Sequence, residues 1–201
     1  IDGTERVIVT QLVRSPGAYL MEPKDATKQV FIANLMPSRG SWLELEIDKK
    51  GVVYARIDRK RKLPITTLLR ALPAEDLSTG FALDTSTNEK ILELFDNSPF
   101  IANTLEKDTT TREEEAVVEV FKKQRPGEPP TLDNSRNLVR ALFFDPKRYD
   151  LTKVGRYKLN QRLGVGVPED TRVLTTEDIL ALVRRLVSLP TKLGVPEDAK
   201  D

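Results

Sequence analysis

Apolar and polar residues alternate most regularly within Arg39–Pro64. Every second residue of Leu43–Ile47 is apolar, the residues between them are acidic, and the alternation resumes over Val53–Ile57. A period of two residues is that of a strand with one buried face. The Asp48–Gly51 segment between the two runs suits a tight turn, because Gly51 can take positive φ. The pattern predicts a two-stranded antiparallel ribbon.

The residues before this ribbon also favour strands. Val7–Val13 is mostly β-branched and apolar, which predicts a well-buried strand. Ala18–Met21 and Gln29–Met36 predict two further short strands on either side of a polar loop, Glu22–Lys28. We therefore expect residues 1–62 to form mostly antiparallel sheet.

Helix-start and helix-stop residues divide the rest of the chain. Pro64 suits the first turn of a helix. Thr111 and Glu114 have the spacing of a capping box, in which the threonine caps the helix and the glutamate reaches back. The proline-rich segment Arg125–Pro130 predicts a stiff connection without helix. Pro190 is expected to end the last helix.

Between these signals, apolar positions recur at helical spacing. The predicted helices are Pro64–Leu72, Thr87–Phe95, Phe100–Leu105, one that starts at Thr111 and stops before Arg125, Thr131–Phe144, Asp150–Leu163, and Thr175–Pro190. Strands first and helices afterwards favour an α+β fold. We expect N-terminal antiparallel strands with a β-ribbon over about 1–62 and a cluster of short helices over about 64–190. Together they form one domain, 1–190, followed by a polar tail, 191–201.

Composition narrows the classes of function. Hydrophobic residues make up 39% of the 201 and charged residues 31%, a balance typical of globular proteins. The net charge is +1, so any nucleic-acid contact must come from local patches. The sequence has no Cys and no His. Disulfides, thiolate nucleophiles, the usual zinc sites and an imidazole general base are therefore excluded.

Two features bear on where this sequence belongs. No apolar run approaches the roughly 20 residues of a membrane span, and no signal peptide is visible, so we expect a cytoplasmic protein. The sequence starts at Ile1 rather than Met and opens directly into strand-like residues. That start indicates a fragment of a longer chain.

Residues with catalytic potential are sparse. Glu113–Glu115 are interpreted as first-turn residues that compensate a helix dipole, not as an acid–base site. Gly164–Gly166 resembles a phosphate-binding loop, but it lacks the full spacing and the lysine of that motif. No spacing of carboxylates specifies a metal site. We predict no catalytic residue and no metal ligand in this chain.

Basic and aromatic residues at the end of the ribbon indicate binding instead. Arg56 and Arg59–Lys62 surround a single acid, Asp58. Such a cluster could neutralise nucleic-acid phosphates, or it could be a solvated strand end. Trp42 could stack on an unpaired base, worth roughly 1–3 kcal/mol, or lie in the core. Further candidates are Arg14, Arg125 and a second basic region of Arg148, Lys153, Arg156, Lys158 and Arg162.

Several segments resemble the β subunit of bacterial DNA-directed RNA polymerase, in the same order along the chain. They are Ile1–Gly17, Arg39–Glu44, Arg56–Pro64, Arg125–Pro130, Arg148–Leu151 and Val154–Asn160. Asp2 stands where the family pattern has Asn, and Val13 stands where His is frequent. The resemblance covers nearly the whole chain, up to about Pro190. It is to the β2 lobe, one wall of the downstream DNA channel.

The resemblance implies an activity that belongs to a whole enzyme. The family synthesises RNA on a DNA template from nucleoside triphosphates, a nucleotidyltransferase reaction of transcription that uses magnesium. Its catalytic aspartates lie in the β′ subunit and have no counterpart here, so no cofactor is implied in this fragment. The implied partners are DNA, the β′, α and ω subunits, and sigma factor.

The resemblance also assigns DNA-binding roles by position. Trp42 matches a tryptophan that stacks on a non-template base near the start site. Arg14 matches an arginine beside the pocket for the next non-template base. Arg59 and Arg61 match basic residues near the downstream duplex.

Four further residues match the family at functional positions. Arg125 and Arg148 match arginines near single-stranded non-template DNA. Arg6 and Gln11 match residues that border the rifamycin-binding region, most of which would lie further along the full subunit. The alternative is a free-standing nucleic-acid or protein interaction module, which the low net charge favours.

Overall fold

The computed structural model describes residues 3, 5–21, 30–74 and 80–192. Within these residues, the chain forms a five-stranded antiparallel sheet followed by seven helices, so the predicted α+β fold is confirmed. The strands pair in chain order. They are β1 (Gly17–Met21), β2 (Phe31–Met36), β3 (Leu43–Ile47), β4 (Val53–Ile57) and β5 (Leu63–Pro64). The predicted loop Glu22–Lys28 and residues 193–201 of the predicted tail lie outside the described residues.

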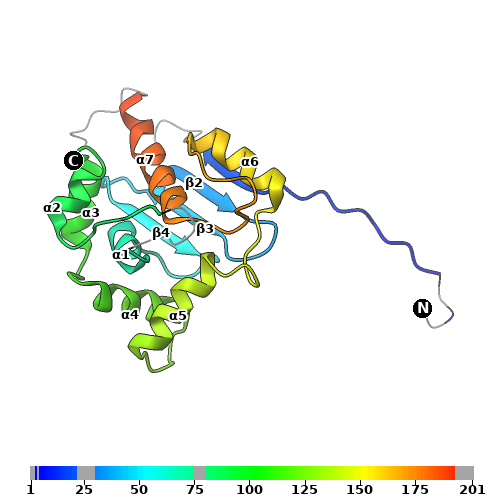
Figure 1. Ribbon diagram of the computed structural model, residues 1–201, viewed down its shortest axis with the longest axis horizontal. Coiled ribbons are helices and arrows are strands. Elements are labelled where there is room, and N and C mark those ends of the chain that lie inside the picture. The colour runs from blue at the N-terminus through cyan, green and yellow to red at the C-terminus, as the bar shows by residue number, and fades with distance from the viewer. Residues whose placement is uncertain (1–2, 4, 22–29, 75–79, 193–201) are drawn as a thin grey trace.

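The helices lie mainly on one face of this sheet (Figure 1). Their bounds are α1 (Ile65–Ala71), α2 (Asn88–Glu93), α3 (Pro99–Lys107), α4 (Glu113–Gln124), α5 (Leu132–Phe143), α6 (Thr152–Leu163) and α7 (Thr176–Lys192). α7 packs against β2 and β3, α6 against β1, and α1 and α3 against β4. α4 packs against α1, and α5 packs against α4.

The register of the strands explains why that face is apolar. Leu45 of β3 lies between Ala33 of β2 and Ala55 of β4, and all three are fully buried. Because side chains alternate along a strand, every second residue points into the same core. The acidic residues between them are only partly buried, on the opposite face.

The predicted ribbon is confirmed as β3 and β4, with Leu43 opposite Ile57. Its turn closes around one carboxylate: Asp48 Oδ1 accepts the N–H groups of Lys50 at 2.9 Å and Val52 at 3.0 Å. Gly51 takes φ 70° there, as the turn requires.

The predicted strand Val7–Val13 is wrong. The segment is an extended arm that leaves the fold (Figure 1), without strand pairing among the described residues. Its apolar side chains are exposed, from 71% at Val9 to 103% at Leu12. A continuous apolar run such as Val7–Val13 is typical of a strand whose two faces are both buried. Among the described residues, no sheet or helix layer covers either face of this arm.

At α1, α4 and α7, the residues that were expected to start or stop the helix act differently. Pro64 pairs in β5 and is the residue before α1, not its first turn. α4 starts one residue later than expected, with Arg112 as its N-cap. The third helical residue is therefore Glu115, and it, rather than Glu114, accepts the Thr111 N–H at 2.8 Å. This bond and the Thr111 hydroxyl lower the pKa of Glu115.

The last helix also continues past its predicted stop. α7 runs through Pro190 to Lys192. A proline removes one backbone hydrogen bond and crowds the preceding turn. Here it lies within the last turn, where few helical bonds remain to be lost.

Candidate nucleic-acid interface

One end of the sheet collects most of the predicted binding residues. β1 and β3 begin where β2 and β4 end, because Gly17 lies opposite Met36 and Leu43 opposite Ile57. The segments that flank these strand ends therefore lie together at one end of the sheet. We call it the cationic edge, and define it as Trp42, Arg59, Lys60, Arg61, Arg125 and Arg148.

Trp42 and the turn after β4 form one unit. The Trp42 N–H donates to Asp58 Oδ1 at 2.9 Å, and the Asp58 N–H donates to the Trp42 carbonyl at 3.0 Å. Asp58 and Arg59 both have positive φ, 51° and 58°. This sparsely populated conformation is held by the paired bonds to Trp42.

The indole of Trp42 is a surface group. It is 41% exposed, and the Arg59 guanidinium carbon lies 5.3 Å from its ring centre. A guanidinium over an indole is a favourable cation–π arrangement. Of the two alternatives left by the sequence, the core position is therefore wrong. The arrangement offers an aromatic surface and a cation side by side.

Lys60 connects the ribbon to α4. Its Nζ donates to the Gln124 carbonyl at 2.9 Å, at the last residue of that helix. Arg125 follows directly, with its guanidinium carbon 5.9 Å from the Phe121 ring centre and Nη1 3.4 Å from a Glu128 carboxylate. The Arg125 side chain keeps 47% of its surface exposed.

Arg148 reaches the same edge through a backbone contact. The Ser38 N–H donates to the Asp150 carbonyl at 2.9 Å, and the Asp150 N–H donates to the Arg39 carbonyl at 2.8 Å. Gly40, at φ 125°, has no room for a side chain: a Cβ would lie 2.6 Å from the Tyr149 ring and 3.1 Å from the Arg148 carbonyl oxygen. The Arg148 side chain itself is 66% exposed and 3.9 Å from Asp145.

Asp150 fixes that contact from the other side. Its Oδ1 accepts the Thr152 N–H at 2.7 Å and the Arg172 Nε–H at 2.9 Å. The hydrogen-bonded Arg172 guanidinium, helped by the Thr152 N–H, lowers the pKa of Asp150. An ionised carboxylate therefore anchors the segment that carries Arg148.

Arg14 lies just before β1, which begins at the same end of the sheet. Its guanidinium carbon is 4.8 Å from the Tyr19 ring centre. Lys158 of α6 donates to Ser15 Oγ at 2.7 Å and ties this corner to the helices. An open pocket of about 530 Å³ lies beside these residues. The sequence did not predict the contact of Arg14 with Tyr19 or that of Ser15 with Lys158. No local pattern indicates either contact.

The ribbon end does not present all its cations in one direction. Arg56 and Lys62 both contact Glu46, at 3.7 Å and 3.5 Å, on the face of the sheet away from the core. Lys62 also lies 4.2 Å from the Tyr54 ring centre. Arg61 is exposed and makes no ion pair with any described residue. Arg59 and Arg61 are therefore the ribbon's available cations.

Arg6 and Gln11 are not brought to this edge. Both lie in the extended arm and are exposed. The described residues also contain no cluster of three or more acidic side chains suited to a metal ion. Among the described helices, none has the length and apolarity needed to cross a membrane.

Comparison with known proteins assigns the family. The family RNA polymerase Rpb2, domain 2, matches residues 14–201. This chain belongs to that family. A DNA-directed RNA polymerase subunit beta of Rubrobacter xylanophilus is 59% identical over 198 residues, which cover 98% of this chain and 16% of the relative.

Two more relatives of this Rpb2 domain 2 chain carry the same name. The one from Streptomyces coelicolor is 50% identical over 191 residues, 94% of this chain and 15% of its own length. The one from Gloeobacter violaceus is 45% identical over 199 residues, 98% of this chain and 17% of its own length. The chain thus spans about a sixth of the length of these curated relatives.

The second basic region of this Rpb2 domain 2 splits into surface and interior. Arg156 is fully buried and donates to Asp178 Oδ1 at 2.7 Å and to the carbonyls of Thr171 and Val173 at 2.7 and 2.5 Å. It joins α6 to the start of α7. Sequence pattern gave no sign of this, because a charged residue in a helix ordinarily faces water. Arg156 is therefore removed from the candidate binding residues.

Asp58 and Lys60 have positioning roles that the sequence did not reveal. In the sequence, Asp58 is a lone acid among cations, but in the structure it fixes the backbone of Trp42 through two hydrogen bonds. Lys60 was interpreted as one more phosphate contact, but its side chain binds the last residue of α4. Both roles depend on backbone atoms far away in sequence.

Proposed function

We propose that this chain is a lobe of the β subunit of a bacterial DNA-directed RNA polymerase and forms part of its downstream DNA channel. In this proposal the cationic edge contacts non-template DNA during transcription. One observation carries it: an exposed indole, clamped by Asp58 and flanked by Arg59, stands beside further exposed arginines at one end of a rigid sheet. The family and its named relatives support the same assignment.

Phosphate attraction is the first part of the mechanism. Arg59, Arg61, Arg125 and Arg148 would neutralise backbone phosphates, which releases counterions and makes binding fall with salt. The net charge of +1 limits this attraction to the edge. We therefore expect the isolated chain to bind single-stranded or forked DNA weakly.

Base stacking is the second part. The free part of the Trp42 indole offers a flat surface to an unpaired base, worth roughly 1–3 kcal/mol per base. Its backbone is fixed in both directions by Asp58, so little ordering is needed when a base arrives. Arg14, on the neighbouring corner, would contact the next nucleotide. In this mechanism the phosphate contacts position the DNA strand, and stacking on Trp42 distinguishes an unpaired base from a paired one.

The chemistry of RNA synthesis belongs, in this proposal, to the rest of the enzyme. This chain supplies no catalytic group, and magnesium is bound by another subunit. Residues 1–190 form the lobe, and β′, α, ω and sigma factor are its partners in a cytoplasmic assembly. The exposed apolar arm that holds Arg6 and Gln11 would be covered by other parts of the subunit, next to the rifamycin region.

Open promoter complexes test the proposal. In the assembled polymerase, Trp42→Ala should shorten their lifetime roughly tenfold, since one stacked base is lost. Trp42→Phe should retain part of the effect, and Arg185→Gln, an exposed arginine of α7, should leave the lifetime unchanged. A lifetime unaltered in Trp42→Ala would contradict the proposal.

A further inference from the structure

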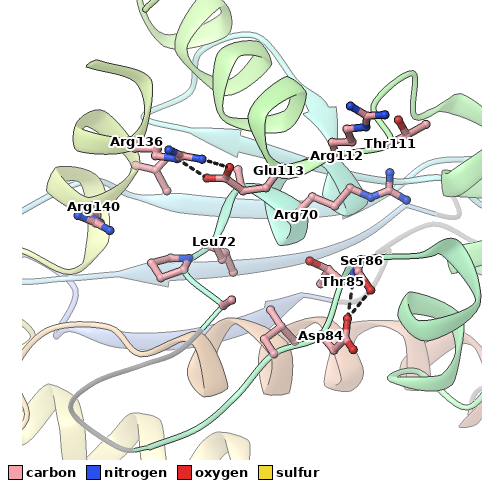
Figure 2. Close-up of a pocket in the computed structure, with 15 residues that line it drawn as sticks. Arg70, Leu72, Asp84, Thr85, Ser86, Thr111, Arg112, Glu113, Arg136 and Arg140 are labelled. Carbon is pink, nitrogen blue, oxygen red and sulfur yellow. Dashed lines mark hydrogen bonds and ion pairs between the residues drawn. The ribbon is translucent and has the colours of Figure 1, made fainter. Parts of the chain in front are cut away.

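A cleft of about 700 Å³ lies at the start of α4 (Figure 2). This is the opposite end of the helix from Arg125 and the cationic edge. The cleft is enclosed by the end of α1 with Leu72–Ala74, by Leu83–Ser86, by Thr111–Glu113, and by one face of α5. α4 has 12 residues, so its two ends are about 18 Å apart. The volume is in the range of small-molecule sites, about 300–1,000 Å³.

The two carboxylates in this cleft are already neutralised. Glu113 accepts from Arg136 twice, from Nε at 2.9 Å and from Nη2 at 2.6 Å. Asp84 is paired with Lys90, and that bond, together with Ser86, lowers the pKa of Asp84 to about 2. Each of these carboxylates is therefore paired with its own cation, Arg136 or Lys90, and does not neutralise the other arginines of the cleft.

Two arginines, Arg112 and Arg140, remain to give the cleft a positive field. Arg112 and Arg140 are exposed at its rim and make no ion pair with any described residue. Arg70 is 2% exposed and donates through Nη1 to the Thr110 carbonyl and through Nη2 to Asn88, and its charge is balanced by the buried Asp108 carboxylate, 4.0 Å from Nη1. Arg112 and Arg140 line the same cleft.

The Nε of Arg70 is a buried donor without a hydrogen-bond partner among the described residues. Leaving such a group unpaired costs about 1–3 kcal/mol. Figure 2 shows the Arg70 side chain between the Arg112–Glu113 side of the cleft and its Thr85–Ser86 side. Arg70 therefore belongs to the wall of the cleft, and the anionic groups of a ligand would be held by Arg112 and Arg140 at its rim.

The remaining walls set the shape of the ligand. Apolar groups line one part of the cleft beside the cations: Ala71, Leu72, Pro73, Leu83 and Val139. Hydroxyl groups of Thr85, Ser86 and Thr111 add donors and acceptors. Guanidinium groups match phosphate oxygens in geometry and charge, and an apolar wall suits a flat ring. We propose that this cleft binds a nucleoside phosphate, with phosphates at the arginines and the ring on the apolar wall.

Calorimetric titration of the 201-residue chain tests this, with ATP, adenosine and inorganic pyrophosphate as probes. ATP should bind, pyrophosphate should bind several-fold more weakly, and adenosine should not bind measurably. Arg112→Gln and Arg140→Gln should each weaken ATP binding at least threefold, and the double variant about tenfold. Arg185→Gln, a matched exposed arginine outside the cleft, should leave it unchanged.

Several outcomes would overturn the proposal. These are no ATP binding at millimolar concentration, equal weakening by Arg185→Gln, or backbone amide shifts that avoid Thr85, Ser86 and Thr111 in NMR spectra. Binding of an acidic peptide such as oligoglutamate, with none of ATP, would assign the cleft to a protein partner instead. The inference is independent of the DNA-channel proposal, because neither Arg112 nor Arg140 belongs to the cationic edge.

Discussion

Arg148 and Arg156 lie a few residues apart in one basic stretch, yet they have opposite roles. Arg148 is 66% exposed, and its nearest carboxylate is 3.9 Å away. Arg156 is fully buried, with Asp178 and two carbonyl oxygens around its guanidinium. The difference is set by the acceptors that the fold brings to each, not by the residue type. An arginine whose carboxylate contact is long and exposed to solvent, as that of Arg148 with Asp145 is, stays available to a phosphate.

Breaking the buried pair should give the largest effect. Arg156→Met would leave the Asp178 carboxylate buried and unpaired, which typically costs 3–5 kcal/mol. Arg148→Met should change the free energy of unfolding by about 0.5 kcal/mol or less. Urea unfolding of both variants measures the contrast. Equal losses in the two variants would remove the distinction between them.

Removing the Asp178 carboxylate as well should recover part of the stability that Arg156→Met loses. In the double variant Arg156→Met with Asp178→Leu, no buried charge remains, so its stability should exceed that of Arg156→Met alone. The Asp178 carboxylate also accepts the Thr175 N–H at 2.8 Å, so recovery should be incomplete. A double variant less stable than the single one would contradict the account.

Trp42 and Leu43 extend the comparison to neighbouring residues. Leu43 is 1% exposed, and Leu43→Ala should lower the free energy of unfolding by about 2–5 kcal/mol. Trp42→Ala should lower it by about 1 kcal/mol or less, while weakening DNA binding roughly tenfold. Thermal melting and DNA titration of both variants separate these effects. A large drop in melting temperature in Trp42→Ala would make the indole a structural group.

Salt dependence separates available cations from paired ones. Removing one phosphate contact to single-stranded DNA should reduce the slope of log K against log salt by about 0.7. We expect this for Arg59→Gln and Arg61→Gln, and no change for Arg56→Gln, whose guanidinium contacts Glu46. Fluorescence anisotropy over a salt series gives the slopes. A reduced slope for Arg56→Gln alone would reverse the assignment.

The smallest expected effect concerns pH. Arg172 lowers the pKa of Asp150, so this pair stabilises the fold above the unfolded pKa of about 3.9 and loses that contribution as the pH falls through the folded value. Arg172→Gln should therefore be less stable than the parent at pH 7, with the difference shrinking toward pH 2. Urea midpoints at both pH values measure it. If the stability difference between the parent and Arg172→Gln grew as the pH fell, the predicted direction of the pH dependence would be wrong.

Local patterns in the sequence predicted the parts of the fold that local chemistry decides. The ribbon and its turn followed from alternation and from Gly51, and the buried stripe of α4 followed from helical spacing at Ala116, Val117, Val120 and Phe121. Val7–Val13 shows the limit. Its apolar residues require a cover, but a sequence pattern does not say whether that cover lies within the same chain.

The candidate site was predictable in its members and not in its geometry. The cluster after β4 was visible as charge, and Trp42 as a lone aromatic. Which cations are free depends on Glu46 and on the Gln124 carbonyl, contacts 10 or more residues away that no local pattern encodes. The exposure of Trp42 depends in the same way on the paired bonds to Asp58.

Trp42 is the only tryptophan of the 201 residues, so the fluorescence of this chain reports on the residue at the centre of the proposal. Titration with forked DNA at low salt should quench that emission, and the quenching should diminish as salt rises. DNA binding that leaves the emission unchanged, or quenching that does not depend on salt, would contradict a stacked base held beside phosphate-binding arginines.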